Sequence, residues 1–293
     1  MKISSKFECK NVLFSVEVFP PKKENPVESI YAAAEKICTL SPDYVSVTYG
    51  AGGSAFQQKV TADLAAHLKK HGAEPLAHLT CVNSSLPEIR SMLRLLKENG
   101  VENILALRGD RAPEAGGDPE LPHASDLIRF IRETGGGFDI AATCYPEGHP
   151  ECDSLEEDIV YLREKVDRGA THLISQLFFD NGDFYRMLEL CDKAGIHVPI
   201  QAGIMPVINS RQIQRMVSLC GAKLPTKFSK IMARYEGNPA ALFDAGICYA
   251  TEQIIDLISS GVRGIHLYSM NNFKVAETIH RNIKNILRGV NES

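Results

Sequence analysis

The sequence lacks several features that would place it in common functional classes. It has no excess of basic residues, because 32 Lys and Arg stand against 36 Asp and Glu, for a net charge of −4. Nucleic-acid binding depends on basic patches. No apolar run approaches the roughly 18 residues that span a bilayer, and residues 1–8 lack the apolar core of a signal peptide. We therefore expect neither a nucleic-acid partner nor a membrane span.

Closely spaced cysteine pairs are also missing. The eight cysteines are scattered and none forms a CxxC pair, which argues against a zinc knuckle and a thioredoxin-like redox pair. A reducing, cytoplasmic location is the simple expectation. Composition is that of an ordinary globular protein, with 44% hydrophobic and 23% charged residues. No shift in composition marks a boundary, so we expect residues 1–293 to form one domain.

What the sequence does contain is a regular alternation of strand and helix patterns. The predicted strands are 13–19, 44–50, 75–81, 103–107, 139–145, 172–179, 198–205 and 264–270. The predicted helices are 26–39, 55–70, 86–98, 124–133, 153–168, 182–193, 210–219, 226–234, 239–260 and 273–287. Such alternation indicates parallel βαβ units. Eight of them favour a closed (β/α)8 TIM barrel, with extra helices between strands seven and eight, over an open doubly wound sheet.

One carboxylate, Glu17, lies inside the first predicted strand, which the prolines 20 and 21 end. A charge in an apolar strand is costly unless it is paired or protonated. In a barrel, the C-terminal ends of the strands are where catalytic residues gather. Two interpretations stay open at this point: a catalytic carboxylate at the barrel mouth, or a Glu that faces outward from an edge strand.

The other strand ends form a polar rim with few charges. It consists of Thr48, Tyr49, His78, Thr80, Arg108, Asp110, Tyr145, His149, Gln176, Gln201, Met205 and Tyr268. These ends contain no His and carboxylate cluster at metal-ligand spacing, so no metal site is expected in the protein. Arg108 and Asp110 either pair with each other or bind a phosphate and a polar ring. The glycine-rich segment 50–54 is either a flexible turn or a place for close approach to an anion.

Seven motifs together resemble the methylenetetrahydrofolate reductase family. They are FSVEVFPPK (14–22), YVSVTYGA (44–51), AHLTC (77–81), ALRGD (106–110), YPEGHP (145–150), QLFFD (176–180) and GIMPV (203–207). The motifs follow the family's order and extend over nearly the whole chain. The sequence most resembles the bacterial form, a catalytic domain without a regulatory domain.

The resemblance implies a TIM barrel with FAD at its mouth that reduces 5,10-methylenetetrahydrofolate to 5-methyltetrahydrofolate. It implies that Glu17 protonates folate N10 to open the ring, that reduced flavin supplies the hydride, and that Asp110 acts near both. It places cofactor contacts at Thr48, Tyr49, Ala51, His78, Arg108, Gly109, Asp110, His123, Ala124, Tyr145, His149, Asp158 and Lys165, and substrate contacts at Gln176 and Gln212. It further implies NAD(P)H or a partner subunit as electron donor, and a homo-oligomer.

The sequence departs from the family pattern at three positions. Asn272 stands where the family usually has an Arg that reaches the folate tail, His123 where a Tyr is common, and Met216 where an aromatic residue covers the substrate. Two alternatives to an NAD(P)H-dependent reductase therefore stay open. One is a flavin- and folate-binding subunit that receives electrons from a partner protein. The other is a pterin-dependent methyltransferase on the same fold, which would need no flavin.

Overall fold

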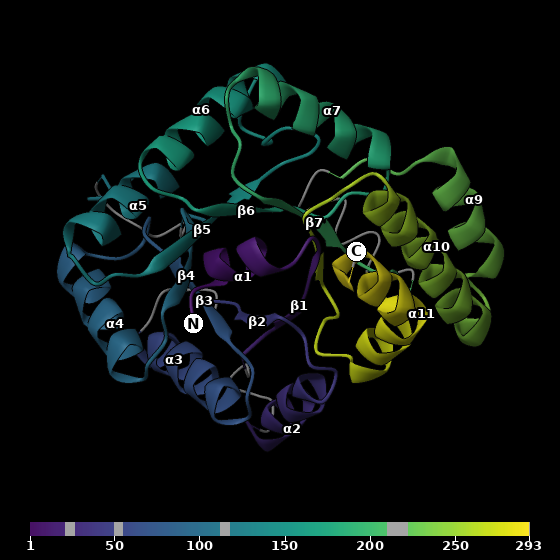
Figure 1. Cartoon of the computed structure of the whole chain (residues 1–293), viewed down its shortest axis with the longest axis horizontal. Coiled ribbons are helices and arrows are strands. Elements are labelled where there is room, and N and C mark those ends of the chain that lie inside the picture. Colours follow the sequence, from purple (N-terminus) through teal and green to yellow (C-terminus); the bar gives the residue numbers. More distant parts are fainter. Residues whose placement is uncertain (21–26, 50–54, 112–117, 210–221, 293) are drawn as a thin grey trace.

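Eight parallel strands close into a barrel in chain order (Figure 1). The computed structural model describes residues 1–20, 27–49, 55–111, 118–209 and 222–292. The strands are β1 (Leu13–Val18), β2 (Tyr44–Val47), β3 (Pro75–Thr80), β4 (Asn103–Leu107), β5 (Asp139–Cys144), β6 (His172–Ser175), β7 (Ile200–Ile204) and β8 (Gly264–Leu267). Since β1 pairs with β8 as well as with β2, the sheet is closed, and the predicted TIM barrel is confirmed.

Helices surround the barrel and bury their apolar faces against it (Figure 1). They are α2 (Val27–Cys38), α3 (Ala55–Lys70), α4 (Leu86–Glu98), α5 (Ala124–Glu133), α6 (Leu155–Asp167), α7 (Asn181–Lys193), α9 (Thr226–Tyr235), α10 (Pro239–Ser259) and α11 (Phe273–Glu292). The predicted extra helices between β7 and β8 are found as α9 and α10, whereas the predicted helix 210–219 lies outside the described residues. In the described ranges, no helix is long and apolar enough to cross a membrane.

Local sequence signals explain where several helices begin. Before α4, the Glu88 carboxylate accepts a hydrogen bond from the Ser85 backbone N–H at 2.8 Å, half of a capping box. Ser154 Oγ accepts from the Glu157 N–H at the start of α6, and Asn238 Oδ1 accepts from the Ala241 N–H at the start of α10. These contacts satisfy N–H groups that have no partner inside a helix. Local capping residues therefore set where α4, α6 and α10 begin.

Strands β2, β6, β7 and β8 are shorter than predicted, and the reasons are clearest for β6 and β8. β6 ends at Ser175, whose hydroxyl accepts a hydrogen bond from the Gly203 N–H at 2.9 Å. Residues 177–179 lie beyond the strand and are buried by side-chain packing. β8 ends at Leu267 because the chain soon turns through Met270 and Asn271, which have φ values of 56° and 59°. Apolar runs do not distinguish strand residues from buried loop residues, so periodicity overestimates both strands.

A short N-terminal helix that the sequence analysis did not predict, α1 (Ile3–Cys9), lies across one end of the barrel (Figure 1). Ile3 and Phe7 are buried against a cluster that includes Leu13 and Tyr44, at the beginnings of β1 and β2. The Ile3 N–H donates to Asn103 Oδ1 at 2.9 Å, and the Ser4 N–H donates to Asp139 Oδ2 at 2.7 Å. The helix covers the end where the strands begin, which leaves the opposite mouth for ligands.

Candidate active site

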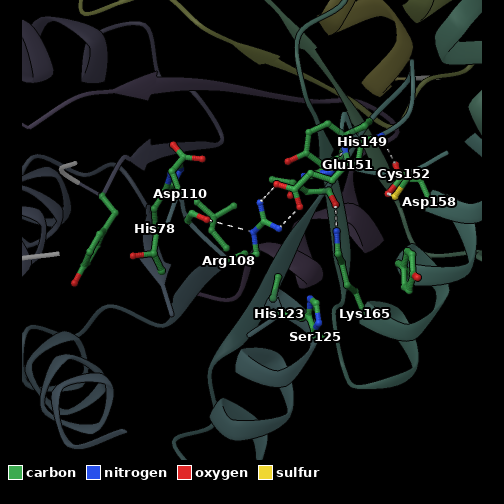
Figure 2. A pocket seen from close by; sticks show the side chains of 18 of the residues that line it. His78, Arg108, Asp110, His123, Ser125, His149, Glu151, Cys152, Asp158 and Lys165 are labelled. Carbon is green, nitrogen blue, oxygen red and sulfur yellow. Dashed lines mark hydrogen bonds and ion pairs between the residues drawn. The ribbon is translucent and has the colours of Figure 1, made fainter. Parts of the chain in front are cut away.

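A cavity of about 730 Å³ opens at the C-terminal ends of β2 to β5 (Figure 2). Its lining is Thr48, Tyr49, His78, Thr80, Asn83, Leu107, Arg108, Gly109, Asp110, His123, Ala124, Ser125, Thr143, Tyr145, His149, Glu151, Cys152, Asp158, Tyr161, Glu164 and Lys165. The predicted cofactor residues all line this cavity except Ala51, which lies outside the described residues. Its volume falls within the range of about 300–1,000 Å³ that is usual for ligand pockets.

Arg108, at the end of β4, directs its guanidinium fork at the Glu151 carboxylate (Figure 2). The two hydrogen bonds join Nη1 to Oε2 at 2.5 Å and Nη2 to Oε1 at 2.7 Å. This contact lowers the pKa of Glu151. The ion-pair partner of Arg108 is thus Glu151 and not Asp110, whose backbone oxygen accepts from Asn83 Nδ2 at 2.7 Å. A bidentate guanidinium at a cavity wall suits a carboxylate or a phosphate.

Gly109 lets the backbone between Arg108 and Asp110 lie close to β3. Its φ is +81°, which side-chain-bearing residues rarely adopt, and an added Cβ would lie 3.0 Å from the Cβ of Thr80. The turn therefore sends the two flanking charged side chains from one strand end to different parts of the cavity rim (Figure 2).

The β5 end and α6 form a second wall, which holds a partly buried cation. Lys165 donates to the Thr143 carbonyl at 3.0 Å, and burial lowers its pKa while the nearby Asp158 opposes this effect. Burial raises the pKa of Asp158, whose carboxylate accepts the His149 N–H at 3.2 Å. The Tyr145 ring packs edge-on against His149 at 4.7 Å. These contacts hold the polar groups of this wall in fixed positions.

Glu17 lies inside the barrel next to the cavity wall. Its side chain is 8% exposed, and its Oε2 is 3.6 Å from Nε2 of His78, which does line the cavity. Burial lowers the pKa of His78 to about 4, against the opposing effect of Glu17, so this ring is neutral near pH 7. Among the described residues, His78 Nε2 has no hydrogen-bond partner. The closed barrel has no edge strand, which removes the interpretation of Glu17 as an outward-facing residue.

Two residues that the sequence analysis did not select, Ser46 and His266, lie behind Glu17. Ser46 Oγ is 3.5 Å from Glu17 Oε2, and His266 Nε2 is 3.8 Å from the same oxygen. His266 Nδ1 is 2.7 Å from Ser15 Oγ. The sequence did carry a signal, because His266 interrupts an apolar strand just as Glu17 does. His266 lies near Glu17 because the β1–β8 pairing aligns it with Ser15, and Ser46 lies there because the β1–β2 pairing aligns it with Glu17.

Other predicted rim residues make internal contacts. Gln201 Oε1 accepts from the Tyr44 hydroxyl at 2.6 Å inside the barrel, and the Tyr268 hydroxyl donates to the Ser175 carbonyl at 2.8 Å. Gln176, which follows β6, accepts the Leu177 N–H on its own side chain and is separate from the cavity lining. The other predicted substrate residue, Gln212, lies outside the described residues.

The cavity also contains residues that the sequence analysis missed, chiefly Glu151, Cys152, Tyr161 and Glu164. Tyr161 and Lys165 are three and seven positions after Asp158, so the helical period of α6 places them on one face. The β5–α6 loop gives no comparable signal for Glu151. Taken together, the site offers a buried carboxylate beside a polar, partly cationic cavity, which is suited to proton transfer to a bound ligand.

Comparison with known proteins identifies relatives over nearly the full chain. Residues 2–284 match the family model described as "Methylenetetrahydrofolate reductase". The chain is 32% identical over 265 residues to 5,10-methylenetetrahydrofolate reductase of Escherichia coli (strain K12), covering 90% of this chain and 88% of the relative. It is 34% identical over 299 residues to Methylenetetrahydrofolate reductase (NADH) 1 of Arabidopsis thaliana, covering 96% of this chain. The chain spans about half the length of that plant relative, 50%.

The fold also matches solved structures. One is described as an uncharacterized protein from Clostridium thermocellum that binds two copies of 5-methyl-5,6,7,8-tetrahydrofolic acid. The TM-score is 0.71 with 16% sequence identity, and the match covers 98% of this chain and 99% of the other. At that level of identity, the likeness concerns the fold alone.

Proposed function

Because the chain belongs to the methylenetetrahydrofolate reductase family, we propose that it reduces 5,10-methylenetetrahydrofolate to 5-methyltetrahydrofolate with FAD as its cofactor. The observation that carries the proposal is the position of Glu17. Its side chain is almost fully buried. Its Oε2 lies 3.6 Å from Nε2 of His78, and His78 lines the cavity. The reaction needs an acid next to a hydride donor, and this geometry offers the acid beside a cavity of cofactor size.

The cavity residues fit a flavin dinucleotide. Arg108 has the bidentate geometry that phosphates accept, and its present partner Glu151 is 62% exposed, so a phosphate can take its place at little cost. Nε2 of His78 lies 3.6 Å from Glu17 Oε2 but has no hydrogen-bond partner among the described residues, so it is a buried polar atom that a ligand can satisfy. The partly buried Lys165 adds positive charge to the wall formed by the β5 end and α6. FAD, when bound here, would supply the hydride-transfer chemistry that amino-acid side chains lack.

In this proposal Glu17 donates the proton that lets folate N10 leave. The neutral His78 on one side and His266 with Ser46 on the other hold its carboxyl group inside the barrel, away from solvent. Burial of this kind keeps bulk water from competing for the proton. Asp110, on the same rim, is proposed to interact with the flavin and the pterin ring. Gln176 and Gln212 are proposed to contact the substrate.

The substrate and the electron donor are supported by the names of relatives. The structural neighbour from Clostridium thermocellum binds a reduced folate according to its description, and the plant relatives are named for NADH. We propose a reduced folate as substrate and NAD(P)H as donor, with a partner subunit as the alternative source of electrons. A pterin-dependent methyltransferase is disfavoured by the family match.

An absorption spectrum followed by an anaerobic assay tests the proposal. Purified protein is expected to contain flavin near one equivalent per chain, and to form 5-methyltetrahydrofolate from methylenetetrahydrofolate and NADH or NADPH. Turnover only after chemical reduction of the flavin would indicate the partner-fed subunit. A colourless protein that forms no product under either condition would contradict the proposal.

A further inference from the structure

Three potential metal ligands meet on the outer surface of the barrel, between α2 and α3. Glu35 comes from the last turn of α2, His67 from the last turn of α3, and His71 follows α3 by one residue. One ligand atom from each residue lies within 4.8 Å of the others. The residues at the strand ends predict no metal site, whereas these three potential ligands lie at the ends of two helices.

The orientations of the two imidazole rings favour metal ligation. His71 Nδ1 is 2.9 Å from the His67 carbonyl oxygen, a contact that requires the proton on Nδ1 and leaves Nε2 with its lone pair when the ring is neutral. A second hydrogen bond of this kind fixes the tautomer of metal-binding histidines in general. The His67 ring is held edge-on against Tyr31 at 4.6 Å. Both Nε2 atoms lie close to the same carboxylate oxygen, Glu35 Oε1.

The separations of the ligand atoms match a shared ion. Glu35 Oε1 is 3.0 Å from His67 Nε2 and 3.7 Å from His71 Nε2. Ligands at 2.0–2.1 Å from a tetrahedral Zn²⁺ are about 3.3 Å apart, which lies between these two values. We propose that Glu35, His67 and His71 bind a divalent transition-metal ion, with Zn²⁺ as the representative. Two imidazoles and one carboxylate suit Zn²⁺ and leave a fourth position for water.

The location of the site indicates a structural role. In a TIM barrel the helices run back from the catalytic mouth, so the C-terminal turns of α2 and α3 lie near the opposite end. An ion there joins two neighbouring helices, because Glu35 precedes His67 by 32 residues and His71 by 36 residues. Because metal binds the folded arrangement of these ligands, its binding energy adds to folding stability. The effect is expected in thermal unfolding and not in the rate of folate reduction.

Equilibrium dialysis with Zn²⁺ and thermal unfolding test the site on the full chain after chelator treatment. We expect one Zn²⁺ per chain and a higher Tm, with the ratio of unfolded to folded protein lowered about 100-fold at a free Zn²⁺ concentration of about 100 times Kd. His67→Ala, His71→Ala and Glu35→Gln should each weaken Zn²⁺ binding by about tenfold or more. All three residues are at least partly exposed, so each variant should fold.

The matched control is His197→Ala, which removes an exposed histidine whose only carboxylate contact in the described chain is Asp192, at 3.5 Å. It should leave Zn²⁺ binding and the Tm increase unchanged. Two results would overturn the proposal. One is a wild-type Tm that Zn²⁺ does not raise, which would mean that Glu35 only forms ion pairs with charged histidines. The other is Zn²⁺ binding that persists in the His67→Ala/His71→Ala double variant, which would assign it to other ligands such as the free cysteines.

Discussion

The Arg108–Glu151 ion pair lies in the cavity wall, where an anionic ligand would compete with Glu151 for the guanidinium. Glu151 is 62% exposed and Arg108 is 32% exposed, and ion pairs in such positions contribute at most about 1 kcal/mol. A phosphate that replaces Glu151 therefore meets an arginine already aimed into the cavity. We propose that Glu151 holds the Arg108 side chain in place until an anionic ligand displaces it.

Arg108→Ala should weaken FAD binding without a comparable loss of folding stability. A hydrogen bond to a charged group contributes about 1.5–3 kcal/mol, which corresponds to roughly 10–150-fold in the FAD Kd. Glu151→Ala should not weaken FAD binding, because it removes only the competing carboxylate. Flavin fluorescence titration measures both, with Arg129→Ala as a control for loss of a surface arginine that pairs with Asp126. Equal FAD affinity in Arg108→Ala and wild type would exclude the phosphate role.

The residues of the polar rim could be predicted from the sequence, but the residues that contact them inside the barrel and across the loops could not. Strand boundaries predict positions such as His78 and Arg108, the family resemblance adds Lys165 on α6, and all three line one cavity. His266 and Glu151 were not selected, because their roles arise from contacts across the barrel and across a loop. Those contacts depend on strand register and loop conformation, which residue identity alone does not determine.

Among the elements, the start of α11 combines two asparagines with different tasks. Asn271 binds Phe19 at both its N–H and its carbonyl, at 2.8 and 3.0 Å, and so ties the end of β8 to the end of β1. Asn272 Oδ1 accepts the Val275 N–H at 3.3 Å and caps the helix. The departure from the family arginine at position 272 therefore provides a helix cap in its place.

Asn272→Arg should tighten folate binding and lower stability at the same time. If the arginine restores a contact to the folate tail, the Kd should fall by roughly tenfold or more, most for polyglutamylated substrate. Loss of the cap should cost about 0.5–2 kcal/mol. Asn272→Ala is the control, since it loses the cap but gains no charge. Folate titration across tail lengths and thermal unfolding separate the two effects, and a Kd that tail length leaves unchanged in Asn272→Arg would show that the tail is held elsewhere.

Long amphipathic helices were predicted to within a few residues, whereas α1 was missed. It has only two buried apolar residues, Ile3 and Phe7, which give too short a pattern to recognise. What stabilises it is tertiary: Asn103 and Asp139 from the barrel accept its first N–H groups. The same limit applies to the proposed metal site. The spacing of His67 and His71 is visible in the sequence, but the approach of Glu35 from another helix is not.

The molecule as a whole encloses histidines that folding keeps neutral. Burial lowers the pKa of both His78 and His172 to about 4, from 6.5. Between these values the unfolded chain binds protons that the folded chain does not, so folding stability falls as the pH decreases. Above about pH 6.5 these histidines are neutral in both the folded and the unfolded chain, and they cost no folding stability. As the pH falls from 6.5 towards 4, folding stability is progressively lost.

His172→Asn should reduce this loss of stability in acid. A pKa lowered from 6.5 to about 4 corresponds to roughly 3 kcal/mol per buried histidine. The variant is expected to be less stable at pH 7, because His172 packs against Phe7, but its free energy of unfolding should depend less steeply on pH between 6.5 and 4. Urea unfolding at several pH values measures the slope. The exposed His197→Asn should match wild type, and an unchanged slope in His172→Asn would refute the assignment.

Strand–helix alternation predicted the architecture because every βαβ unit is local in sequence. Closure was less certain from sequence, since it depends on the pairing of Leu13 to Val16 with Gly264 to Leu267 at the other end of the chain. That pairing also places His266 beside Glu17. The surroundings of Glu17, the proposed acid, therefore form only when the first and last strands of the barrel meet.

The measurement that tests the central claim most directly is a stopped-flow comparison of the two half-reactions in Glu17→Gln. Glutamine preserves the size of the side chain but cannot donate an acidic proton. The account predicts normal FAD content, normal bleaching of the flavin by the electron donor, and reoxidation by methylenetetrahydrofolate slowed by about 10²–10⁴-fold. Glu151→Gln, which changes an exposed carboxylate of the same cavity, should slow neither half-reaction. Reoxidation at the wild-type rate in Glu17→Gln, or equal slowing of both half-reactions, would contradict the account.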